Sequence, residues 1–226
     1  MPLARSDKVL PFRPVPRETV QARVHGQLVA MILDGEIEPG QTVTITALSE
    51  VFGVSAMPVR EALHRLTAAG ALTNLVGRSV GIPPLSVERL LDLKRVRVEI
   101  EGLAAEWAAR NATDALLAQL DEMIARMSGF AADDEAKAFL PVNREFHFAV
   151  YAASGSEALL AVIENLWLQI GPYLSLLRGS GNWGGANRQH QLLRRALEHA
   201  DGGAARAAVR ADIEEAARIL VKLLTL

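Results

Sequence analysis

Apolar residues recur every three to four positions from Val20 to Ile32, which is the spacing of an amphipathic helix. Thr19 precedes this run and is a residue that caps helix N-termini. Gly35 follows it and favours the left-handed backbone found at helix ends. The pattern therefore predicts a first helix between these two residues.

A shorter helix is predicted next, because Leu48, Val51 and Phe52 share one helical face behind Thr46, a capping residue. Gly53 ends this pattern in the position that suits a left-handed residue. A third helical pattern begins two residues later, so the sequence predicts two helices joined by a tight glycine turn.

The second helix of this pair has two different faces. Ser55 is its expected N-cap, with a side chain that accepts from the opening backbone N–H groups. Pro58 lies in the first turn, where its missing N–H costs little. The apolar face carries Val59, Leu63 and Leu66, and the opposite face carries Met57, Arg60 and His64. Such a helix suits a DNA major groove, although an ordinary surface helix has the same pattern.

Two short stretches after this helix predict a β-hairpin. Ala71–Val76 and Ser79–Ile82 are strand-like, and Gly77-Arg78 is the turn between them. Further strand-like residues stand upstream: Val43 and Ile45. A helix-turn-helix followed by a two-stranded wing is a winged helix.

The remainder of the chain predicts helices alone. Pro83-Pro84 favours an extended chain and marks a domain junction. Six helical segments follow, so an antiparallel all-α bundle is the natural packing solution. They are Val87–Asn111 behind Ser86, a helix capped by Thr113 that includes Met127, Asp133–Ala153 around Pro141, Ser156 to about Leu177 with an interruption near Gly171-Pro172, Asn187–His199, and Ala204–Leu224. A Gly-rich loop, Gly179–Gly185, holds an exposed Trp183. The expected domains are an arm (1–16), the winged helix (17–82) and the bundle (83–226).

Composition agrees with a mainly α protein of the cytoplasm. Half of the 226 residues are hydrophobic and only 5% are aromatic. The absence of cysteine excludes disulfides and thiolate metal sites. No apolar run reaches the ~18 residues of a membrane span, and the basic arm lacks the apolar segment of a signal peptide. A net charge of −2 argues weakly against a general nucleic-acid coat and leaves room for one DNA-binding face.

Three runs of the N-terminal half occur in a characteristic order: Gly35–Gly40, Leu48–Ser55 and Pro58–Leu63. Together they resemble the DNA-binding domain of GntR-family transcription regulators. The resemblance implies a homodimer that places two recognition helices in successive major grooves of a near-palindromic, double-stranded operator. The implied DNA contacts are Ser55, Ala56, Met57 and Arg60 on the helix, and Gly77 and Arg78 on the wing. Ala56-Met57 departs from the family, which commonly has Arg and Thr here, so the operator sequence should differ.

Four polar residues of the predicted bundle look expensive to bury. Asn143 and His147 are four apart on one helix face. His190 is close to Leu192 and Leu193, and Asp212 is followed by Ile213 on the last helix. Imidazoles and a carboxylate that converge inside a bundle can hold a divalent cation. Hydrogen-bonded core histidines would give the same pattern.

The run Arg97–Ala105 resembles the opening helix of the ligand-binding domain in the FadR branch of that family. That domain often carries an Asp and a His four apart and two further histidines, and here Asn143 and Asp212 replace the first and last of these. The resemblance implies a divalent metal, zinc or alternatively nickel or manganese, and a small carboxylate effector that Arg97 contacts. An Arg97–Glu101 pair within the helix is the plain alternative. Three other residues are expected at the surface: Arg95, Arg144 and His199.

The leading hypothesis is thus a DNA-binding regulator, not an enzyme and not a membrane protein, whose operator affinity depends on a metabolite in the bundle. Two alternatives remain open. A metal-dependent hydrolase or lyase could use the same His and Asp residues, although no motif supplies an acid or base beside the metal. A DNA-binding scaffold with a purely dimerising bundle is the other.

Overall fold

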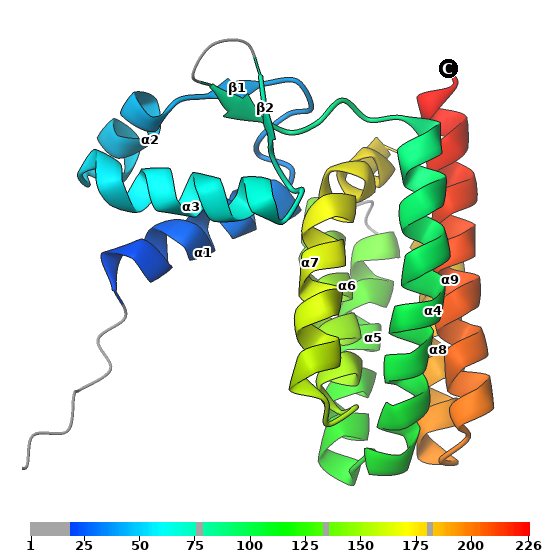
Figure 1. The fold of residues 1–226 in the computed structure, drawn as a ribbon. Helices are drawn as coiled ribbons and strands as arrows, with labels where there is room; N and C mark the ends of the chain where they lie inside the picture. The colour runs from blue at the N-terminus through cyan, green and yellow to red at the C-terminus, as the bar shows by residue number, and fades with distance from the viewer. Residues whose placement is uncertain (1–18, 76–78, 133–135, 180–182) are drawn as a thin grey trace, which may run out of the picture.

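The computed structural model describes residues 19–75, 79–132, 136–179 and 183–226, and within these it omits the side chains of residues 131, 132, 136, 137, 178, 179 and 183–186. Four predicted features lie outside this description: the basic arm, the wing tip Gly77-Arg78, the middle of the Gly-rich loop and the side chain of Trp183. The described part confirms a mainly α fold, with nine α-helices and one small antiparallel sheet (Figure 1).

Helix α1 (Val20–Leu33) begins and ends as its pattern predicts. The Thr19 hydroxyl accepts a hydrogen bond from the backbone N–H of Ala22 at 3.1 Å. Gly35 has a φ of 63°, in the left-handed region, directly after the helix. The inner face is buried and consists of Val24, Leu28 and Ile32.

Helix α2 (Ile45–Phe52) begins two residues earlier than predicted. Its cap is Thr44, whose hydroxyl accepts from the backbone N–H of Ala47 at 3.2 Å, so the prediction of Thr46 was wrong. The earlier start places Ile45, which was expected in a strand, one helical turn before buried Leu48 on the core side.

Helix α3 (Ala56–Ala68) has the two predicted faces. Val59, Leu63 and Leu66 are buried, whereas Met57, Arg60 and His64 are exposed. Ser55 occupies the N-cap position, but its side chain makes no capping hydrogen bond, so that part of the prediction was wrong. Gly53 joins the two helices with a φ of 62°.

The wing is part of a three-stranded sheet rather than a two-stranded hairpin. Strands β2 (Thr73–Asn74) and β3 (Val80–Gly81) form the expected antiparallel pair, and β1 (Thr42–Val43) pairs with the other edge of β3. Gly81 lies in the central strand, where an added Cβ would stand 2.2 Å from the carbonyl oxygen of Gln41. A residue without a side chain is therefore required there.

The C-terminal half contains the six predicted helices. They are α4 (Val87–Asn111), α5 (Asp114–Ala132), α6 (Ala136–Ala152), α7 (Glu157–Leu174), α8 (Trp183–Glu198) and α9 (Gly202–Leu224). The main differences from the predicted boundaries lie in α7 and α8, and α9 begins at Gly202 rather than Ala204. Helix α7 continues through Gly171 and Pro172 and is followed by a 3₁₀ helix, η1 (Ser175–Gly179), and α8 begins at Trp183 inside the expected loop. Pro172 lies two residues before the end of α7 and cannot donate the helical hydrogen bond to the carbonyl oxygen four residues earlier.

The segment Glu157–Leu177 is long and apolar enough to cross a membrane by length and composition. Several of its apolar side chains, including Ile163, Trp167 and Ile170, belong instead to the buried core of the bundle. The hydropathy of α7 is thus explained by its place as a core helix.

The two halves have separate hydrophobic cores and meet along one side of the bundle. Figure 1 shows the winged-helix half beside α7, while α4 and α9 run next to each other on the far side. Gly171 of α7 permits close approach, because an added Cβ would lie 3.0 Å from the side chain of Leu33 in α1.

Candidate functional site

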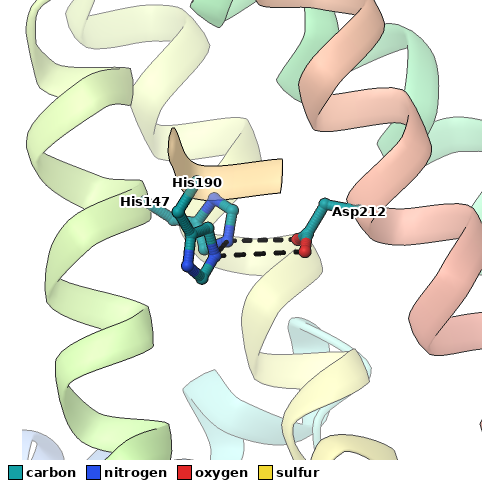
Figure 2. A group of neighbouring side chains, drawn as sticks. All are labelled: His147, His190 and Asp212. Atoms are coloured by element: carbon teal, nitrogen blue, oxygen red, sulfur yellow. Dashed lines mark hydrogen bonds and ion pairs between the residues drawn. The ribbon is translucent and has the colours of Figure 1, made fainter. Parts of the chain in front are cut away.

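Three side chains from three helices point to one position inside the bundle. His147 comes from α6, His190 from α8 and Asp212 from α9 (Figure 2). The two histidine Nε2 atoms lie 3.3 Å apart. The Asp212 carboxylate oxygens lie 3.2 Å from Nε2 of His147 and 3.9 Å from Nε2 of His190.

This donor set fits a divalent cation. Tetrahedral zinc with bonds of about 2.0–2.2 Å separates its ligand atoms by roughly 3.3–3.6 Å, which is close to the spacing observed. Both imidazoles are almost completely buried, at 2% and 0% exposure. Burial lowers the pKa of His190 to about 3, against the opposing effect of the Asp212 carboxylate, so its ring stays neutral as a ligand must. Burial would raise the pKa of Asp212, but the hydrogen bond and charge of His147 outweigh it and lower that pKa.

A buried polar network lies behind His147. Arg97 and Glu101 of α4 form an ion pair, with Nε to Oε1 at 2.5 Å and Nη2 to Oε2 at 3.2 Å. Glu101 also accepts from the Tyr151 hydroxyl at 2.6 Å and from the Trp167 indole N–H at 3.1 Å. The Tyr151 oxygen lies 3.2 Å from Nδ1 of His147. The plain alternative for Arg97, a pair with Glu101, is therefore present in the structure.

The charge of Arg97 is retained but balanced. Burial would lower the pKa of its guanidinium, yet the charge of Glu101 outweighs burial and raises that pKa. The guanidinium also lies over the Trp167 ring, 5.4 Å from its centroid. Arg97 is thus a positively charged wall residue whose counter-ion, Glu101, is already in place.

A cavity of about 50 Å³ adjoins the His–Asp cluster. Its polar wall includes Arg97, Asn143, His147 and Asp212, so all of the predicted metal and effector residues except His190 line it. Much of the remaining wall is apolar and includes Phe139, Leu140, Leu174, Leu177 and Ile213. The space suits a small molecule with one polar end.

The same wall reaches the winged-helix half. A second cavity of about 20 Å³ is lined by Asn143 and Trp167 together with Leu33 of α1. Arg144, the residue after Asn143, pairs with Asp34 at the end of α1 with an N–O distance of 3.0 Å. The prediction that Arg144 is a solvated surface residue was therefore wrong, whereas Arg95 and His199 are exposed as expected.

A second cross-half contact was missed by sequence reasoning. Nη2 of Arg89 on α4 donates to the carbonyl oxygen of Gly70 at 2.8 Å and to Gln169 of α7 at 3.2 Å. No sequence motif predicts these Arg89 hydrogen bonds, because both partners are remote from Arg89 in the sequence.

The predicted DNA-contacting residues of α3 lie on its exposed face. Ser55, Ala56, Met57 and Arg60 are all exposed, and Met57 retains 63% of its surface. Val51 of α2 is 75% exposed nearby in the sequence. Both helices of the helix-turn-helix thus carry a large apolar residue that is exposed in the described structure.

Comparison with known proteins decides the family. Residues 20–82 match the gntR family of bacterial regulatory proteins, and residues 92–215 match the FCD domain. The chain belongs to the GntR family. It is 32% identical over 155 residues to the HTH-type transcriptional regulator McbR of Escherichia coli (strain K12), which covers 69% of this chain and 70% of that protein. It is 29% identical over 136 residues to the Nta operon transcriptional regulator of Aminobacter aminovorans, covering 60% of this chain and 64% of that protein.

Solved structures support the same placement of this GntR-family chain. E. coli McbR/YncC superposes with a TM-score of 0.84 and 28% identity, over 91% of this chain and 98% of that one. A putative GntR regulator from Rhodococcus sp. RHA1 gives a TM-score of 0.72 at 19% identity, over 89% and 97% of the two chains, and so shows the shared fold. This protein is a DNA-binding transcription regulator. The hydrolase or lyase alternative is not supported, because the family and the named relatives are regulatory.

Proposed function

We propose that this regulator works as a homodimer whose affinity for its operator is controlled by a small carboxylate bound at a divalent metal ion in the FCD domain. The observation that carries the proposal is the convergence of His147, His190 and Asp212 beside a cavity whose wall continues to the winged-helix half. We place the protein in the cytoplasm, where its operator would be.

The metal would be held by His147, His190 and Asp212, with Asn143 as a neighbouring oxygen donor. Two nitrogens and a carboxylate suit zinc, and nickel or manganese also accept this set. A bound divalent ion supplies a Lewis-acid anchor for one end of the effector. Asn143 lines the same cavity and would orient that end.

The charges of the site explain why an anionic effector would need the metal. Arg97 is balanced by Glu101, the His190 ring is neutral, and Asp212 carries a negative charge. Counting the His147 ring as a neutral ligand, the cluster of two histidines and Asp212 alone would repel a carboxylate. A divalent ion gives this cluster a net charge of about +1, before Glu215, which also lines the cavity, is counted. One carboxylate group on a short apolar body fits this charge and the apolar walls.

The operator would be bound through α3 and the wing. Met57 and Arg60 would reach base edges or phosphates in the major groove, with Ser55 and Ala56 at the start of the helix. Gly77 and Arg78 would contact the DNA backbone. Two such helices in one dimer would occupy half-sites about one helical turn apart.

A second copy of the chain is proposed to cover the α4–α9 side of the bundle. A groove there is lined by Leu91 and by charged residues of both signs, namely Lys94, Glu214, Glu215, Arg218 and Lys222. Leu91 and Val96 are large apolar residues with 39% and 44% exposure. A two-fold axis through this face would bring opposite charges together across an apolar centre.

Effector control would act through the shared wall between the cavity and α1. A ligand against Asn143 and Trp167 changes the packing beside the Arg144–Asp34 pair. It can shift the arrangement of the two halves only if it binds one arrangement more tightly.

The proposal is tested by operator titration. An operator selected from random DNA is titrated by fluorescence anisotropy with metal-free protein, zinc-loaded protein, and zinc-loaded protein with each of a panel of small carboxylates. We expect one or more monocarboxylates to change operator affinity only in the zinc-loaded protein. Operator affinity that no carboxylate alters in either form would leave a DNA-binding scaffold with a purely dimerising bundle.

A further inference from the structure

We propose that Glu101 and Tyr151 are positioning residues that fix the imidazole of His147 as a metal ligand. The proposal rests on the metal site described above and adds two residues that do not touch the metal. Both are completely buried, and they come from α4 and α6.

The argument begins with the single hydrogen of the Tyr151 hydroxyl. Its oxygen lies 2.6 Å from Oε2 of Glu101 and 3.2 Å from Nδ1 of His147. An ionised carboxylate can only accept, so the hydroxyl hydrogen points to Glu101. The hydroxyl oxygen is then left to accept, and Nδ1 of His147 must carry the hydrogen of that second bond.

Glu101 is held firmly enough to impose this direction. Its two oxygens accept from Arg97 and from the Trp167 indole as well as from Tyr151. Arg97 supplies the opposite charge that a carboxylate needs in a site without exposure. A fully satisfied buried network of this kind restricts each member to one orientation.

A hydrogen on Nδ1 leaves Nε2 of a neutral His147 with a bare lone pair. That lone pair faces the Asp212 carboxylate at 3.2 Å and Nε2 of His190 at 3.3 Å (Figure 2). A bare nitrogen lone pair and a carboxylate oxygen this close together repel each other unless a cation or a proton lies between them, and the centre of the three ligands is where a metal ion would lie. Outer hydrogen bonds that fix a ligating histidine typically change metal affinity 10–100-fold when removed.

The second histidine lacks such support. Within the described residues, Nδ1 of His190 is buried without a hydrogen-bond partner. The hydrogen-bonded pair of Glu101 and Tyr151 therefore orients a ligand ring before the metal binds. Loss of either side chain should lower the affinity for the metal.

The experiment compares Tyr151→Phe and Glu101→Gln with Tyr173→Phe in the full-length protein. Tyr173 is a matched control, because it is a buried tyrosine of the same bundle whose hydroxyl bonds to the backbone of Ser86. Zinc affinity is measured by competition with a chromophoric chelator. We expect about a 10–100-fold loss in Tyr151→Phe and a smaller loss in Glu101→Gln, whose amide can both donate and accept, with no loss in Tyr173→Phe.

A second readout is the ring tautomer of His147 in metal-free protein, from ¹⁵N NMR of the imidazole nitrogens. We expect hydrogen on Nδ1 in the unaltered protein and a mixture of both tautomers in Tyr151→Phe. Two results would refute the positioning role of Glu101 and Tyr151 without refuting the metal site. One is a hydrogen on Nε2 alone in the unaltered protein, and the other is the same zinc affinity in the unaltered protein and all three variants. Absence of zinc binding by the unaltered protein would overturn both.

Discussion

The guanidinium of Arg144 lies 3.0 Å from the carboxylate of Asp34 and joins the helix of His147 to the end of α1. Both side chains are only partly exposed, at 26% and 33%. Arg144 directly follows Asn143, which lines the cavity beside the His–Asp cluster. The pair therefore connects the helix that lines the candidate effector site to the end of α1 in the DNA-binding half.

Arg144→Ala should uncouple the effector from the operator. Because a partly exposed pair contributes only ~0–1 kcal/mol to stability, folding and operator affinity without effector should change little. The change in operator affinity caused by effector should shrink several-fold, as expected when a coupling of ~1–3 kcal/mol is weakened. Anisotropy titrations with and without effector measure this.

Arg126→Ala is the matched control for that variant. Arg126 pairs with Glu145 of α6 at 3.8 Å, but both belong to the bundle and are exposed. Its effector response should equal that of the unaltered protein. An undiminished response in Arg144→Ala would remove the pair from the coupling route.

Arg60→Ala should abolish operator binding while the dimer remains folded. Arg60 is exposed on the recognition helix and makes no contribution to its buried face. Loss of one base-edge or phosphate contact should cost ~1–3 kcal/mol in each half-site. Gel-shift titration measures the loss, with Arg65→Ala as the control, since Arg65 is also exposed but lies in the last turn of the same helix. Equal affinities of Arg60→Ala and the unaltered protein would refute the assignment.

Ala56→Arg should change the preferred operator sequence. Ala56 has no donor for guanine, whereas exposed Met57 can pack against a thymine methyl. The unaltered protein should therefore depend on apolar contact and DNA shape at this position, and an arginine should favour guanine. Selection from random DNA with both proteins measures the preference, and the same selected site for both would refute it.

The stability of the metal-free protein should fall as pH drops below about 6.5. Burial lowers the pKa of folded His190 to about 3, against the effect of Asp212, while unfolded His190 takes up a proton near pH 6.5. Between these values the unfolded state binds more protons, so stability falls by up to ~1.4 kcal/mol per pH unit, or ~2 kcal/mol from pH 6.5 to 5.

Denaturant unfolding in the presence of a chelator at several pH values measures this slope. His190→Asn supplies the comparison, because it removes the titrating ring. It should be less stable near pH 7 but should lose less stability on acidification. Parallel pH profiles of the two proteins would show that His190 is not buried as a neutral ring.

The sequence predicts those parts of the fold and site that depend on local patterns. The faces of α3 follow from helical spacing, and His147 stands out between Phe146 and Phe148, whereas the family resemblance is what joins His190 and Asp212 to it. The exact helix starts were harder, since Thr44 and Thr46 are equally good caps by residue type, and only the packing of Ile45 selects the first.

The contacts that sequence reasoning missed join residues that are far apart in the chain. Arg144 and Asp34 are 110 residues apart, and Tyr151 meets Glu101 only because α4 packs against α6. Strand β1 is two residues long, too short for an alternating pattern to indicate that it adds an edge to the wing. Helix pairing and strand addition are tertiary events, which spacing along one element does not encode.

The central claim is that His147, His190 and Asp212 hold one divalent metal ion. It is tested most directly by elemental analysis of untagged protein purified without chelator and then offered zinc, nickel or manganese. We expect about one equivalent of metal per chain, removal of that metal by His190→Ala, and retention by His199→Ala, whose histidine is exposed at the end of α8. Chelation should lower the melting temperature of the unaltered protein but not that of His190→Ala, because bound metal ties three helices together. Less than about a tenth of an equivalent of any of these metals in the unaltered protein, with no uptake on addition, would contradict the account.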